Sequence, residues 1–166
     1  MPQEDPYSKE KAKPEIPACG KSTAAIHFSG SFLALVGGGK SFAYPAVSGK
    51  PDAKRKFDNS EERQKQKGVG PIPQGDYWIS PEDLWENAWY KSGSTSGWGN
   101  YRITLRVYPG TETHGRGGFF IHGGSVAGSA GCIDLTSKMD QFVADMKVVV
   151  GATRDCFIPV RVRYST

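Results

Sequence analysis

The chain has 166 residues, the usual size of a single domain. It contains 21 glycines and 11 prolines, and 37% of its residues are hydrophobic, a composition that favours short strands and turns over long helices. The net charge of +4 is spread along the chain, which excludes the concentrated basic surface of a nucleic-acid-binding protein. No stretch approaches the roughly 20 consecutive apolar residues of a membrane span, so we expect none.

Residues 1–22 differ in composition from the rest of the chain. They hold four prolines among mostly polar residues, so we expect a flexible or peripheral arm before one domain over residues 23–166. The arm has charged residues and no apolar core, which predicts the absence of a secretory signal peptide. We therefore expect the protein to be made in the cytoplasm without a leader and to need a dedicated route outward.

Three cysteines, Cys19, Cys132 and Cys156, stand too far apart for a zinc-binding pattern, and we expect neither a metal nor another cofactor. One interpretation is three reduced thiols. The other is a free functional thiol at Cys132 together with a disulfide between Cys19 and Cys156. A thiol count under denaturing, non-reducing conditions separates the two.

Short strand-like segments open the domain. Strands are expected over 24–28, 32–36 and 41–47, and the glycine-containing turns between them predict a β-meander. Pro45 lies in the third of these strands and indicates a sheet edge or a bulge, because proline has no N–H to donate to a neighbouring strand.

A charged segment follows the meander. Residues 50–67 have no hydrophobic period, so we expect an exposed loop with a helical turn at 60–65. The octet at 70–77 combines proline, which fixes φ, with glycine, which permits positive φ, and predicts a rigid turn. This turn leads into a short strand over 77–80.

The second half of the chain carries the clearest periodicities. Strict alternation over 100–108 predicts one half-buried strand, and further strands are expected at 119–121 and 157–164. Apolar residues recur with helical spacing over 139–146, after a capping box that begins at Ser137. We therefore predict a mostly β fold, a single-domain sandwich or barrel with one principal helix.

The segment from His122 to Cys132 carries the chemistry. The two residues are ten positions apart, and the loop between them contains four glycines, which fold a thiol back toward an imidazole at little steric cost. A cysteine attacks as a thiolate, and a histidine within hydrogen-bonding distance takes its proton. The alternative is a small buried cysteine and an unrelated histidine, and His27 and His114 are competing bases in other segments.

The longer run from His122 to Leu135 ends in Ser129-Ala-Gly-Cys-Ile-Asp-Leu135. It resembles the signature of the YkuD-type L,D-transpeptidases. The whole pattern is more similar to the L,D-transpeptidase effectors that bacterial type VI secretion systems deliver. Matching segments at 42–50, 70–77 and 120–124 extend the resemblance over nearly the whole domain. It implies the L,D-transpeptidase catalytic fold, with the principal helix after the nucleophile.

The resemblance also implies a role for each matching residue. Cys132 would be the nucleophile and His122 its general base, with the Gly123 carbonyl holding the imidazole in the correct tautomer. Backbone N–H groups of Gly131 and Cys132 would line the oxyanion hole. Further candidates for contact with the substrate are Ser129, Phe120 and Trp98.

The chain departs from the broad family within this segment. Ala130 replaces the second histidine of the signature, which leaves His122 as the only nearby base. The loop from His122 to Ser129 is shorter than usual. Asp134 stands where an arginine is usual, so a contact of that arginine with a substrate carboxylate does not transfer.

The activity implied by the resemblance is attack on the L,D-amide between diaminopimelate and the terminal D-alanine of a peptidoglycan tetrapeptide stem. Water would complete an L,D-carboxypeptidase reaction, and an amine would complete exchange or cross-linking. As an antibacterial effector, the protein would act in the periplasm of a target cell. Its partners would be the secretion machinery and a cognate immunity protein.

Two alternatives stay open. Trp85, Trp89 and Trp98 lie near Gly- and Ser-rich loops, where aromatic rings cover a core edge or stack on sugar rings. A non-catalytic module that binds the cell wall through this region is therefore one alternative. The other is a thiol amidase that cuts a different bond of the stem.

Overall fold

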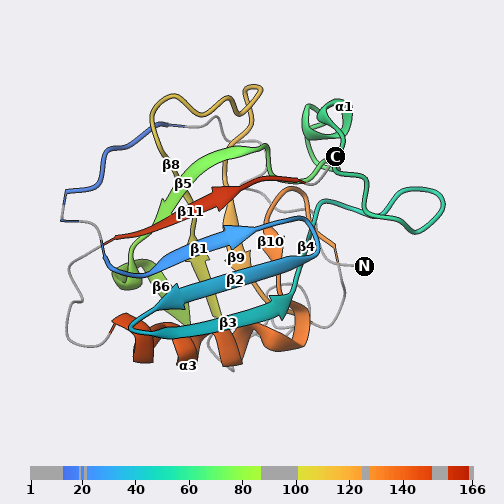
Figure 1. Ribbon diagram of the computed structural model, residues 1–166. Helices are drawn as coiled ribbons and strands as arrows, with labels where there is room; N and C mark the ends of the chain where they lie inside the picture. Colours follow the sequence, from blue (N-terminus) through green and yellow to red (C-terminus); the bar gives the residue numbers. More distant parts are fainter. Residues whose placement is uncertain are drawn as a thin grey trace.

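Two β-sheets and one long helix make up the structure (Figure 1). The computed structural model describes residues 13–18, 20, 22–86, 101–124, 128–150 and 157–164. Buried apolar side chains from both sheets and from the helix form one core. The predicted mostly β fold with one principal helix is confirmed.

The larger sheet has six strands in the order β3-β2-β1-β11-β5-β8. The first three form the predicted meander of antiparallel hairpins, and β11 lies parallel to β1 and antiparallel to β5. The strands of this sheet are β1 (Ala25–Phe28), β2 (Phe32–Gly37), β3 (Lys40–Pro45), β5 (Gly75–Ile79), β8 (Arg106–Val107) and β11 (Ile158–Val162).

The smaller sheet has five strands in the order β4-β10-β9-β7-β6. They are β4 (Val47–Ser48), β6 (Leu84–Glu86), β7 (Tyr101–Thr104), β9 (Phe120–His122) and β10 (Ile133–Asp134). The neighbours β9 and β10 are parallel. His122 ends β9, and Cys132 immediately precedes the neighbouring strand β10.

Two predicted strands are each divided between the sheets. The strand expected over 100–108 breaks at Leu105, so β7 joins the smaller sheet and β8 the larger one, while Leu105 donates its N–H to the Phe119 carbonyl. The strand expected to reach Val47 stops at Pro45 on the sheet edge, and Val47 begins β4. The prediction of continuous strands is wrong in both places, because alternation does not reveal which sheet a strand joins.

The predicted helix is α3 (Met139–Val150), which runs along the lower edge of Figure 1. It packs against β2, β3 and β7. Tyr44 stacks edge-to-face on Phe142 with ring centroids 5.7 Å apart, and its hydroxyl donates to Asp145. The buried residues of the helix are Met139, Phe142, Val143, Met146 and Val150, which contain the predicted apolar face.

The start of α3 differs from the expected capping box. Ser137 lies inside a 3-10 turn, η3 (Thr136–Lys138), that runs directly into the helix. Asp134 instead accepts the N–H of Thr136 at 2.8 Å and so satisfies a donor at the start of this turn. The prediction of a cap at Ser137 is therefore wrong. Within the described ranges, no helix has the length and apolar character to cross a bilayer.

The charged segment after β4 contains the expected helical turn, α1 (Glu61–Gln64). Ser60 Oγ accepts the N–H of Arg63 at 3.3 Å, which is the geometry of a helix N-cap. Gln64 is buried, and its side-chain oxygen accepts the N–H of Gln74. One further 3-10 turn, η2 (Pro81–Asp83), precedes β6.

Residues 13–18 of the N-terminal arm include a segment held against β8. Glu15 donates its N–H to the Val107 carbonyl at 2.9 Å, and its own carbonyl accepts the indole N–H of Trp78 at 3.0 Å. Its carboxylate forms an ion pair with Arg106 at 2.9 Å. Residues 1–12 lie outside the described part of the chain.

Candidate active site

A row of paired residues crosses the smaller sheet at the end of β9. The register pairs Arg102 with His122 and His122 with Asp134. Directly paired residues point to the same face of a sheet, so these three side chains share one face. The neighbouring pair, Ile121 and Ile133, points to the opposite face and is fully buried.

Cys132 lies directly before β10, in the bend that ends the loop from His122. The next two residues, Ile133 and Asp134, pair with Ile121 and His122 of β9. The loop thus brings Cys132 back to the start of the strand beside β9, which carries His122.

His122 is held as a neutral imidazole with a defined tautomer. Its side chain is 3% exposed, and Nδ1 lies 2.7 Å from the Gly123 carbonyl oxygen. Because a carbonyl only accepts, Nδ1 carries the proton and Nε2 keeps a lone pair. Burial lowers the pKa of His122 from its ordinary 6.5 to about 4, with a smaller contribution in the same direction from Arg102. The imidazole is therefore uncharged at neutral pH.

Asp134 is a further residue of the candidate site. The sequence did not predict its position beside His122. Its side chain is fully buried, and Oδ1 lies 3.9 Å from His122 Nδ1. The two carboxyl oxygens accept the N–H groups of Thr136 at 2.8 Å and Gly128 at 3.0 Å. Burial raises the pKa of Asp134 from 3.8 to about 7, although both hydrogen bonds oppose the shift.

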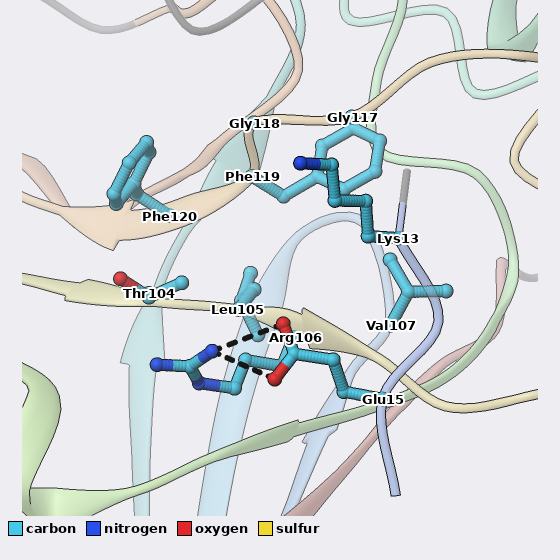
Figure 2. A pocket seen from close by; sticks show the side chains of 10 residues that line it. All are labelled: Lys13, Glu15, Thr104, Leu105, Arg106, Val107, Gly117, Gly118, Phe119 and Phe120. Atoms are coloured by element: carbon cyan, nitrogen blue, oxygen red, sulfur yellow. Dashed lines mark hydrogen bonds and ion pairs between the residues drawn. The ribbon is translucent and has the colours of Figure 1, made fainter. Parts of the chain in front are cut away.

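The Cys132 thiol lies behind the wall of a cavity. Its Sγ is 3.9 Å from the Gly118 carbonyl oxygen, and the residue is 1% exposed. Gly118 lines a cavity of about 470 Å³, shown in Figure 2. The other lining residues are Lys13, Glu15, Thr104, Leu105, Arg106, Val107, Gly117, Phe119 and Phe120.

Ser129 secures the segment that carries the thiol. Its hydroxyl donates to the Cys132 carbonyl at 2.7 Å and accepts the N–H groups of Gly49 and Gly131 at 3.3 and 3.4 Å. The side chain therefore supports the loop and does not line the cavity. The Gly131 N–H is directed at this hydroxyl, so its expected part in an oxyanion hole stays a prediction.

Arg116 is a second site residue that sequence reasoning missed. It is 1% exposed, and its guanidinium donates to backbone carbonyls of Gln64, Gly70, Pro71 and Ala130. A Cβ atom on Gly131 would lie 2.5 Å from the guanidinium, and Gly131 has a φ of +127°. Only glycine permits this approach. A single arginine among glycines has no sequence pattern that distinguishes it from a surface arginine.

Two aromatic rings pack against Arg102, the residue that pairs with His122. The Arg102 guanidinium lies 4.4 Å from the ring centre of Trp85 and 5.2 Å from that of Phe120. Phe120 lines the cavity, and its contact with a substrate stays a prediction. Trp89 and Trp98 lie outside the described residues, so the aromatic cluster and the candidate contact at Trp98 are not placed.

The competing bases lie in other parts of the fold. His27 belongs to β1 of the larger sheet and is exposed, and His114 lies in a turn with a φ of +55°. Cys132 is buried and forms no disulfide with another described residue, while Cys19 and Cys156 lie outside the described residues. In the described part of the chain, no three His, Cys, Asp or Glu side chains are grouped closely enough to hold a metal ion.

Comparison with known proteins identifies the family. The structure is similar to the crystal structure of Mycobacterium tuberculosis L,D-transpeptidase 1, with a TM-score of 0.45 and 19% identity over 86% of this chain. The similar region spans 60% of that chain. No protein of curated function matches the sequence. A family model for the Tlde1 domain matches residues 43–154, more than half of the chain, including His122 and Cys132. The chain therefore belongs to the Tlde1 domain family of type VI L,D-transpeptidase effectors.

Proposed function

We propose that this protein is a cysteine enzyme that attacks the L,D-amide between diaminopimelate and the terminal D-alanine of peptidoglycan tetrapeptide stems. The observation that supports the proposal is the position of Cys132 directly before β10, the strand that pairs with β9 at His122, together with a His122 tautomer in which Nε2 is unprotonated. Membership of the Tlde1 domain family supports the substrate class.

In the first half of the reaction the thiol acylates. The Sγ proton of Cys132 passes to His122 Nε2, and the thiolate attacks the diaminopimelate carbonyl carbon. The backbone N–H of Cys132 is the candidate donor to the resulting oxyanion, since the Gly131 N–H is directed at the Ser129 hydroxyl, and one such donor is typically worth about 2.7–4 kcal/mol. The carbon–nitrogen bond then breaks, the imidazolium returns its proton to the leaving amine, and D-alanine departs.

In the second half the thioester is resolved. His122, neutral again, takes a proton from water or from an incoming amine, which attacks the thioester carbonyl and releases the Cys132 thiolate. Water gives a tripeptide, and an amine gives exchange or a cross-link. The low pKa of His122 keeps the imidazole available as a base throughout the neutral range.

The stem approaches from the cavity beside Gly118. This cavity is large enough for part of a peptide, at about 470 Å³, and Gly118 separates it from the sulfur.

We also propose that the protein acts as an antibacterial effector. Removal or exchange of D-alanine in the periplasm of a target cell would deplete the donors for normal cross-links. This setting requires the type VI secretion machinery for delivery and a cognate immunity protein in the producing cell. Family membership is the support for each of these partners.

Mass spectrometry of purified tetrapeptide stems tests the proposal. The wild type should release D-alanine, and a D-amino acid in the mixture should replace it in part of the product. The Cys132→Ala variant should do neither. Loss of a fragment other than D-alanine would show a different thiol amidase, and binding of sacculi without any change of muropeptide mass would show a wall-binding module.

A further inference from the structure

The buried guanidinium of Arg116 has a charge that its hydrogen bonds do not neutralise. Its four described acceptors are neutral carbonyls, at 2.6, 2.7, 2.9 and 3.4 Å. Among the described residues, no carboxylate lies within ion-pair distance of it. By volume, Arg116 is the largest of the fully buried side chains. A buried charge is costly unless an opposite charge compensates it.

The groups packed around Arg116 leave one candidate for this counter-charge. Tyr77 of β5 and Tyr164 beyond β11 face it, but burial raises the pKa of both phenols, which donate their hydroxyl protons to the Pro73 and Ile72 carbonyls. The Phe119 ring centre lies 5.9 Å away and is uncharged. Cys132 remains, and its thiolate favours the charged guanidinium.

The backbone before Cys132 holds the guanidinium in place. One guanidinium nitrogen lies 3.4 Å from the Ala130 carbonyl and 2.5 Å from the point where a Cβ of Gly131 would be. The same nitrogen donates to the Gly70 carbonyl, and the other terminal nitrogen donates to the carbonyls of Gln64 in α1 and of Pro71. Three segments therefore hold Arg116: α1, the turn at 70–71 and the residues directly before Cys132.

We propose that Arg116 is the buried counter-ion of the Cys132 thiolate. When the Sγ proton passes to His122, the total charge of the site is unchanged, and the guanidinium compensates the new negative charge on sulfur. Arg116 stabilises the thiolate by its charge and forms or breaks no bond in the reaction. It is therefore a positioning residue. This inference rests on the proposed role of Cys132 as nucleophile.

A pair of substitutions at Cys132 tests the counter-ion without disturbing Arg116. Cys132→Asp places a permanent carboxylate where the thiolate would form, and Cys132→Asn is its neutral isostere. At pH 8, the Asp variant should melt at the same temperature as the Asn variant or higher. If the Asp variant melts several degrees lower, the carboxylate has no buried partner and the proposal is overturned.

The reactivity of the thiol tests the same point in the native protein. Alkylation of Cys132 by iodoacetamide, followed by peptide mass spectrometry across pH, reports the thiol pKa separately from Cys19 and Cys156. In Arg116→Met the inflection should move upward and the rate at pH 7 should fall about tenfold. Arg116→Lys should restore most of the rate, because the charge remains.

An exposed arginine provides the control. Arg161 pairs with Asp76 on the surface of the larger sheet, and Arg161→Met should leave the Cys132 inflection unchanged. An unchanged inflection in a folded Arg116→Met protein would overturn the proposal; if that variant does not fold, the Asp–Asn comparison decides. Both assays need no substrate, so their failure is distinct from a failure to cleave stems.

Discussion

His122 and Asp134 face each other across the parallel strands β9 and β10, with Nδ1 3.9 Å from Oδ1. Both side chains are buried, at 3% and 0% exposure. Burial lowers the pKa of His122 to about 4 and raises the pKa of Asp134 to about 7. Between about pH 4 and pH 7 both groups are uncharged, and above about pH 7 the carboxylate forms beside the imidazole.

The two residues should give pH dependences of stability with opposite signs. In D134N, His122 keeps a native pKa of about 4 against 6.5 when unfolded, so the unfolded state binds more protons and stability is lost as the pH falls through this window. In H122N, Asp134 keeps about 7 against 3.8, so the native state binds more protons and stability is lost as the pH rises. Each effect is at most about 3–4 kcal/mol.

Urea denaturation between pH 4.5 and 7.5 measures how the free energy of unfolding changes with pH in each variant. The wild type, in which the two effects oppose each other, should be flatter than either variant. Slopes of the same sign in D134N and H122N would contradict the placement of these two groups in a common buried environment.

Asp134 should also shape the pH dependence of catalysis. Its ionised carboxylate stabilises the imidazolium that forms when Cys132 loses its proton, so kcat/KM for stems should rise as the pH increases through about 7. The D134N variant should lack this rise and fall about tenfold below the wild type at pH 8. The control is Asp140→Asn on α3, which should keep the wild-type dependence of kcat/KM on pH. If D134N also keeps the wild-type dependence, Asp134 does not stabilise the imidazolium.

Ser129 should matter for stability as well as for activity. Replacement by alanine removes the hydroxyl that joins the Cys132 carbonyl to the N–H groups of Gly49 and Gly131. Leaving buried partners unsatisfied costs about 1–3 kcal/mol, and the loosened loop should reduce kcat more than it raises KM. Thermal melts and steady-state kinetics measure this, with the exposed Ser137→Ala as control. Equal melting temperatures for the two variants would show that the hydroxyl does not support the loop.

Lys13 should contribute to substrate affinity. Its side chain reaches from the arm across the cavity toward Gly118 and Phe119 (Figure 2), and peptidoglycan stems carry free carboxylates. A partly exposed pair of this kind is worth up to about 1 kcal/mol, so Lys13→Glu should raise KM about fivefold with little change in kcat. Lys147→Glu on α3 makes the same charge change away from the cavity. The same KM in both variants would exclude a contact at Lys13.

Local patterns in the sequence predict most elements of the fold. The hairpins of β1, β2 and β3, the helix α3 and the final strand β11 follow from turn residues and periodicity, because each depends on neighbours close in the chain. The division of 100–108 between β7 and β8 does not follow. Both halves keep one alternation, and only the long-range pairing with β9 and β5 separates them.

The sequence likewise predicts some residues of the candidate site and not others. His122 and Cys132 stand out because they share one glycine-rich segment and a family signature. The contacts of Asp134 and Arg116 depend on pairing between β9 and β10 and on the packing of α1 against the loop, which no local pattern records. The arm also reaches the cavity through a contact of Glu15 with β8, far away in the sequence.

Intact-protein mass spectrometry of the enzyme quenched during turnover detects the acyl-enzyme of the proposed mechanism. This mechanism should give an adduct with the mass of the tetrapeptide stem less D-alanine, mapped to Cys132 and absent from Cys132→Ala. Release of D-alanine at equal rates by the wild type and by Cys132→Ala, or an adduct on a different residue, would contradict it.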